Sequence, residues 1–184
     1  RHLCSLCQTS VVKEDSVIQN SYHSVLTQLE SVGLRNIPKK IPIELVNLHQ
    51  LKNNSGNLAH SNLKGFTKTE LLTNSKNNQT RTYQVFLLNG LPKIEFEAVL
   101  AHELLHVWLY ENRVTLLSES TEGFCNLGSA LIYENDGTHF SDIHLQAMTN
   151  DSDHYYGSGY RRLKARLDES GCNNLVQNLL NPDN

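Results

Sequence analysis

The spacing of apolar residues predicts that most of this chain is helical. From about Asp15 to Val32, apolar residues recur three and four positions apart, and Gly33 follows as a typical helix stop. Helical spacing also predicts further helices at Lys93–Glu111, Ser118–Asn135, Gly159–Asp168 and Cys172–Leu180. The helix beginning at Lys93 is apolar on nearly every side, which is typical of a helix at the centre of a fold.

Extended segments are predicted in the first half of the chain. Two runs, Phe66–Thr73 and Arg81–Leu88, flank the polar sequence NSKNNQ and predict a β-hairpin. The segment IELVNLHQL (43–51) predicts another strand, and the polar sequence KNNSGNLAHSN (52–62) a loop. We therefore expect an α+β fold, in which a small mixed or antiparallel sheet packs on the central helix and a mainly helical half follows.

Composition and charge narrow the classes of function. A chain of 184 residues suits one domain with a sizeable core. Its formal net charge is −3, and it carries no dense block of Lys and Arg, so we expect no nucleic-acid partner. No apolar run approaches the ~20 residues that span a bilayer, so we expect no membrane association.

The cysteines do not form the pattern of a disulfide framework. Cys4 and Cys7 form a C-x-x-C pair, which is half of a tetrahedral zinc site. We interpret residues 1–10 as the remnant of a zinc-knuckle or LIM-like module, and residues 11–184 as a metallopeptidase domain; the alternative is an adventitious pair. Cys125 and Cys172 lie singly in predicted helices, so we expect reduced thiols and a cytoplasmic location.

The strongest chemical signal is LAHELLHVW, which contains the pattern H-E-x-x-H. On a helix His102 and His106 lie on one face, about 40° apart, so both imidazoles can reach one Zn²⁺ ion. Glu103 lies beside them as a candidate general base for a zinc-activated water. The alternative is a core helix whose histidines bond backbone groups, but burying these polar groups without a strong partner costs several kcal/mol.

A catalytic zinc needs a third protein ligand, and the helix that follows offers candidates. Glu122 is the best of them, and Glu119 is the competitor one turn earlier; either could instead be a first-turn glutamate that favours the helix dipole. Asn126, one turn after Glu122, could orient His102 or His106 through the second ring nitrogen.

The segment T-E-G-F-C resembles the one that carries the glutamate ligand in gluzincin aminopeptidases and, more loosely, in thermolysin-like enzymes. The segments NGLPKIEFEAVLAHELLHVWL, SESTEGFCN and YYGSGYRRLKA, in this order between about Asn89 and Leu175, resemble the LIM-containing, ubiquitin-dependent "DA-one" peptidases that restrict plant organ size. The resemblance implies a zincin-like fold and a zinc metallopeptidase of the HExxH…E type that cleaves intracellular proteins.

The resemblance also implies roles for individual residues. The zinc ligands would be His102, His106 and Glu122, with Glu103 as the base. By the family's Y-G-x-G segment, Tyr156 would donate a hydrogen bond to the oxyanion; its neighbours His154, Tyr155 and Tyr160 are the alternatives. By the same resemblance, ubiquitin or a ubiquitinated regulator would be a partner. The ubiquitin-interacting motifs and the intact LIM module of the plant proteins are absent from this sequence, so it does not support activation by ubiquitin and fits a bacterial or minimal homologue.

We therefore expect a zinc-dependent endopeptidase acting on protein or peptide substrates. An edge strand beside the metal-binding helix could pair with an extended peptide. Two alternatives stay open, a silent protein-binding module with a structural zinc ion and an exopeptidase. The retained Glu103 argues against the first, and the second would need an acidic anchor for a substrate amine, which the sequence does not identify.

Overall fold

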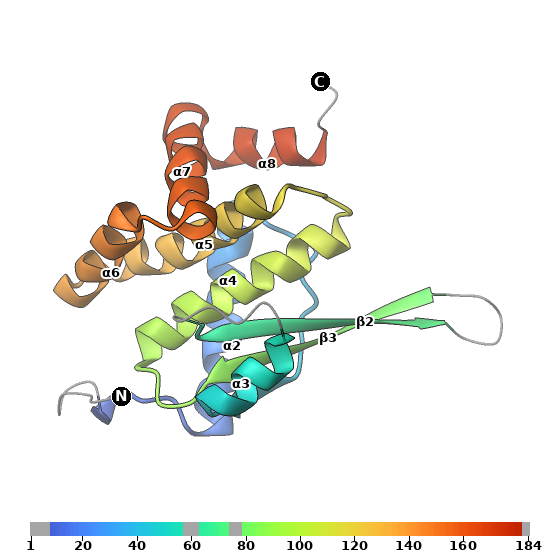
Figure 1. Ribbon diagram of the computed structural model, residues 1–184, viewed down its shortest axis with the longest axis vertical. Helices are drawn as coiled ribbons and strands as arrows, with labels where there is room; N and C mark the ends of the chain where they lie inside the picture. The colour runs from blue at the N-terminus through green and yellow to red at the C-terminus, as the bar shows by residue number, and fades with distance from the viewer. Residues whose placement is uncertain (1–7, 57–62, 74–78, 182–184) are drawn as a thin grey trace.

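The helix that carries the two histidines lies at the centre of the fold. A computed structural model describes residues 8–56, 63–73 and 79–181, so the Cys4–Cys7 pair and most of residues 1–10 lie outside the described residues. Helix α4 (Lys93–Glu111) lies between a small sheet and a group of C-terminal helices (Figure 1). The α+β class, with a mostly helical second half, is confirmed.

The other elements follow the chain in the order that Figure 1 shows by colour. They are α2 (Asp15–Ser31), β1 (Ile43–Val46), α3 (Leu48–Ser55), β2 (Gly65–Thr73), β3 (Gln79–Leu88), α5 (Ser118–Asp136), α6 (His139–Asn150), the π-helical turn η2 (His154–Ser158), α7 (Gly159–Ser170) and α8 (Cys172–Leu180). The bounds of α4 and α8 are the predicted ones, and α2, α5 and α7 differ from the predictions by one or two residues.

The sheet has the strand order β1-β3-β2 and is mixed. β2 and β3 form the predicted antiparallel hairpin, with Thr67 opposite Val85, while β1 runs parallel to β3. The central strand is the most buried, with Val85 and Leu87 fully inaccessible to solvent. In the described sheet β2 is an edge strand, and it packs against α4.

The predicted strand over residues 43–51 is wrong in its second half. β1 ends at Val46, and Asn47 then caps helix α3. The Asn47 side chain accepts a hydrogen bond from the Gln50 amide (2.9 Å), and the Gln50 side chain accepts one from the Asn47 amide (2.9 Å). This capping box starts a helix where the apolar residues alone had suggested an extended run, and it also turns residues 52–55 of the predicted loop into helix.

Helix α4 is buried on most sides, as predicted. Leu100, Ala101, Leu104 and Val107 are inaccessible to solvent, and Trp108 packs on Phe124 of α5 with ring centroids 5.4 Å apart. Because this helix is held by the sheet, α2 and α5 together, its side chains have fixed positions. None of the helices in the described ranges combines the length and the apolar character that crossing a membrane requires.

Candidate metal and catalytic site

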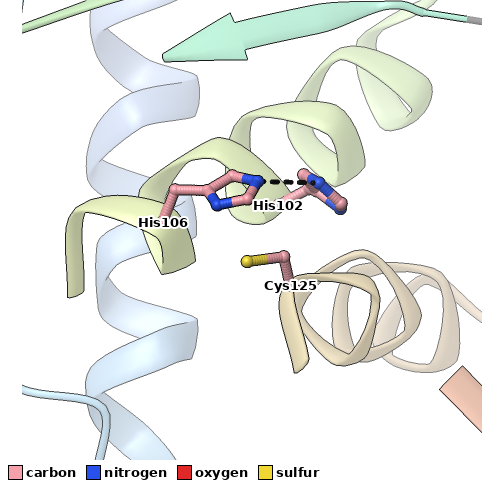
Figure 2. Close-up of side chains that lie close together, drawn as sticks. All are labelled: His102, His106 and Cys125. Carbon is pink, nitrogen blue, oxygen red and sulfur yellow. Dashed lines mark hydrogen bonds between the residues drawn. The ribbon is translucent and has the colours of Figure 1, made fainter. Parts of the chain in front are cut away.

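Two imidazoles on α4 face each other in the interior of the molecule. The Nε2 atoms of His102 and His106 are 3.2 Å apart, and the side chains are 13% and 21% exposed. Both rings project from one face of α4 toward α5 (Figure 2), as the four-residue spacing predicts. The small remaining exposure leaves this pair within reach of a ligand from solvent.

Glu122 on α5 supplies a third donor atom to the same point. Its Oε2 atom lies 3.3 Å from His102 Nε2 and 3.9 Å from His106 Nε2. Glu119 has other partners: its Oε1 atom accepts a hydrogen bond from the Ser158 hydroxyl (3.1 Å) and pairs with Arg162 Nη1 (3.1 Å). Of the two predicted candidates for third ligand, Glu122 is therefore the one beside the histidines.

Asn126 fixes the tautomer of His102. The amide Nδ2 of Asn126 donates to the backbone oxygen of Tyr156 (3.2 Å), so its Oδ1 atom faces His102 Nδ1 at 3.0 Å. An amide oxygen only accepts, and Nδ1 therefore carries the ring proton. In the neutral ring the Nε2 lone pair of His102 then points at His106 and Glu122, which is the orientation that a metal ligand needs.

The three donor atoms fit a small divalent cation. Tetrahedral zinc with bonds of about 2.0–2.2 Å separates its nitrogen and oxygen ligands by about 3.4 Å, close to the distances between these atoms. Burial and the neighbouring His102 lower the pKa of His106 to about 4, with Glu122 opposing them. Burial also lowers the pKa of His102, but the hydrogen bond to Glu122 and the charges of Glu103 and Glu122 outweigh it, so the net shift is upward. A positive charge on one imidazole thus opposes a positive charge on the other, whereas a metal ion accepts a lone pair from each ring.

Cys125 is a further candidate donor that the sequence prediction did not assign. One ring nitrogen of His102, one of His106 and the Cys125 sulfur all lie within 4.8 Å of one another, and Figure 2 shows the thiol directed toward His106. The side chain is inaccessible to solvent, and burial, together with the charges of Glu122 and Glu103, raises the pKa of the thiol. A signal for it existed in the sequence, because Cys125 follows Glu122 by three residues and so shares its helix face.

The carboxylate of Glu103 is enclosed between α4 and the edge strand. The side chain is 4% exposed, and the Thr67 hydroxyl donates to its Oε2 atom (2.7 Å). Burial raises the pKa of Glu103 to about 7, while the charge of His102 and the Thr67 hydrogen bond oppose the increase. A carboxylate with a pKa near neutrality, one residue from a candidate metal ligand, can both accept and return a proton.

Tyr156 lies in the turn η2, which packs against α5, the helix that carries Glu122. Burial raises the pKa of its phenol, and so do the negative charges of Glu122 and Glu103. The hydroxyl therefore stays protonated and has the chemistry of a hydrogen-bond donor. Of the alternatives, Tyr160 is 3% exposed in the core and His154 is 73% exposed beside Glu119, while the Tyr155 side chain lies outside the described part of the structure.

Two glycines allow α5 to approach the turn that carries Tyr156. A Cβ atom on Gly123 would lie 2.3 Å from the carbonyl carbon of Gly159, and one on Gly159 would lie 2.1 Å from the backbone oxygen of Glu119. Both obstacles are backbone atoms, which cannot rotate away as a flexible side chain can. The glycine after Glu122 is thus required by the close packing of α5 against α7.

We expect Gly123→Ala to separate α5 from α7 and to lower the stability of the fold by about 1–3 kcal/mol, the usual cost of overpacking. Chemical denaturation of the variant and the parent measures this difference. The control is Gly137→Ala at the C-terminus of α5, where an added Cβ meets only the Glu134 oxygen at 4.0 Å and the cost comes from the backbone angle (φ 60°) alone. Equal stability of Gly123→Ala and the parent would contradict the packing described here.

Comparisons with known proteins support the resemblance to the DA-one family. A family model described as "DA1-like: Protein DA1" matches residues 56–147, which is half of the chain. The LIM domain-containing protein HDR3 of Oryza sativa subsp. japonica is 25% identical over 181 residues, covering 82% of this chain and 35% of the rice protein. The chain thus spans about a third of the length of that relative. No solved structure gives a significant match.

Proposed function

This chain belongs to the DA1-like family, and from that membership together with its site we propose that it is a zinc-dependent endopeptidase. The observation that carries the proposal is the placement of Glu103, a buried carboxylate beside three converging donors, His102, His106 and Glu122. A purely structural metal site has no use for such a group, whereas hydrolysis needs a base at this position.

In this proposal His102, His106 and Glu122 hold the zinc ion. When bound, zinc supplies a Lewis acid that makes water a better nucleophile and polarises the substrate carbonyl. Asn126 keeps the Nε2 lone pair of His102 directed at the ion through the hydrogen bond to Nδ1.

The proton is handled by Glu103. Its carboxylate accepts a proton from the attacking water and later donates it to the leaving amine, for which a pKa near neutrality is suited. Tyr156, with its phenol kept protonated by burial and nearby carboxylates, donates a hydrogen bond to the oxygen that becomes negative in the transition state.

The substrates we propose are proteins or peptides in extended form. β2 is an edge strand of the described sheet and contacts α4 at Glu103, so a peptide pairing with it would pass close to the base. A cytoplasmic location belongs to the proposal, and so does ubiquitin or a ubiquitinated regulator as a partner; the partner rests on the sequence resemblance alone.

A second candidate function is a protein-binding module with a structural zinc ion. Cys125 is the observation that favours it, because a fourth protein donor would fill the coordination position that a catalytic site keeps open. Zinc content without turnover, together with zinc loss in a Cys125 variant, would distinguish this alternative.

Removal and return of the metal tests the proposed function. We expect the purified chain to cleave an unfolded protein such as casein, a chelator to abolish cleavage, and zinc to restore it, because the chain's own residues do not generate a nucleophile without the ion. Cleavage rates at each stage, with zinc content measured on the same samples, provide the readout. Undiminished cleavage by fully zinc-depleted protein would contradict the proposal.

A further inference from the structure

We propose that Thr67 of the edge strand is a positioning residue for the general base Glu103, an inference that rests on the proposed function. Thr67 Oγ1 lies 2.7 Å from Glu103 Oε2 and 3.2 Å from the Glu103 backbone oxygen. In the described part of the structure, no other side chain makes a hydrogen bond to this carboxylate. The orientation of the base thus depends on a residue from a different element, 36 positions away in sequence.

The strand β2 also restricts the position of the second carboxylate oxygen of Glu103. Gly65, two residues before Thr67 and so on the same face of β2, lies over the Glu103 side chain. A Cβ atom on Gly65 would lie 2.6 Å from Glu103 Oε1 and 2.8 Å from Val99 Cγ1. One oxygen is therefore held by a hydrogen bond, and the other is confined by close contact with the strand.

The position of Thr67 is itself well fixed. Thr67 pairs with Val85 of β3, which is inaccessible to solvent at the centre of the sheet. A β-branched residue has a restricted χ1 angle in a strand, so its hydroxyl has few alternative directions. A glutamate side chain, in contrast, has several rotatable bonds, and an active site gains most when such a group is held in the reactive geometry.

Thr69 offers a matched control on the same strand. It follows Thr67 by two residues and so faces the same side, and its buried hydroxyl has no hydrogen-bond partner in the described residues. Thr67→Val and Thr69→Val therefore make the same chemical change at neighbouring positions of one strand. Only the first removes a hydrogen bond to Glu103.

The test compares kcat, KM, zinc content and melting temperature for Thr67→Val, Thr67→Ser, Thr69→Val and Glu103→Gln. We expect Thr67→Val to lower kcat by about 10- to 100-fold, the scale of loss when a catalytic group is misplaced, with little change in KM or in zinc content. Thr67→Ser, which keeps the hydroxyl, should recover most of the parent kcat, and Thr69→Val should match the parent.

Other outcomes overturn the inference in distinguishable ways. If Glu103→Gln is inactive and Thr67→Val cleaves like the parent, the base is right but Thr67 does not position it. If Thr69→Val loses as much activity as Thr67→Val, or if Thr67→Val loses zinc, the loss comes from a general disturbance of β2 or of the metal site. The inference is then wrong. If Thr67→Val does not fold, an unrecovered kcat in a folded, zinc-loaded Thr67→Ser also contradicts it. Full cleavage by Glu103→Gln would overturn the proposed function itself.

Discussion

Glu103→Gln is expected to bind zinc as the parent does and to lose cleavage by a factor of about 10²–10⁴, the usual contribution of a general base. Glutamine has nearly the same shape, so the enclosed position between α4 and β2 stays filled, but a neutral amide does not accept a proton from water. The measurement is kcat on an unfolded protein substrate, with zinc determined on the same preparations.

Glu97→Gln is the matched control for this variant. Glu97 lies in the same helix, is also buried at 6% exposed, and has Lys93 Nζ 3.7 Å from its Oε1 atom. It precedes His102 by five residues, which places it about 140° around the helix from that histidine. We expect this variant to keep the parent rate. Cleavage by Glu103→Gln at the parent rate would exclude Glu103 as the base, and an equal loss in both variants would show only that α4 does not tolerate the change.

Loss of a residue that only supports a metal ligand typically weakens metal binding by about 10- to 100-fold. Glu122→Ala removes a donor atom itself, so we expect it to weaken zinc binding by more than that. A competition titration against a chromophoric chelator at fixed pH measures this loss. The pH must be held constant because the ligands bind metal only when deprotonated.

Two control variants identify the third ligand. Glu119→Gln should bind zinc like the parent, because Glu119 pairs with Ser158 and Arg162 instead of facing the histidines. Cys125→Ser should keep most of the zinc affinity, because in the proposed ligand set the thiol packs beside the site and does not bind the ion. A larger loss in Cys125→Ser than in Glu122→Ala would contradict the ligand set proposed here and would favour the structural-zinc alternative.

Helices and strands were predictable from the sequence where the residues of one element suffice to define its start, its end and its apolar pattern. The bounds of α4 were predictable because Pro92 precedes its first turn and apolar residues recur along its whole length. Helix α3 was missed because its start depends on the side chains of Asn47 and Gln50, which the apolar pattern of IELVNLHQL concealed. Helix α6 was not predicted either; its only fully buried residue is Ser141, so its apolar signal is weak.

In the site too, contacts within one element were predictable and contacts between elements were not. The proximity of His102 and His106 follows from the geometry of a single helix, so their four-residue spacing was enough to predict it. The choice of Glu122 over Glu119 depends on how α5 is rotated against α4. The sequence favoured Glu122 but left Glu119 open, and the resemblance of T-E-G-F-C to known peptidases added support for Glu122. The contact of Thr67 with Glu103 joins a strand to a helix 36 residues later, and no periodic pattern in the sequence carries that information.

The most direct test of the account is the amount of zinc bound per chain in the purified protein, compared with a His102→Ala variant prepared in the same way. We expect about one zinc ion per chain at this site in the parent and almost none in the variant. The reason is that the donor atoms of His102, His106 and Glu122 converge on a single point. A variant that holds as much zinc as the parent, or a parent that takes up no zinc when it is supplied, would contradict the central claim that these residues form a zinc site.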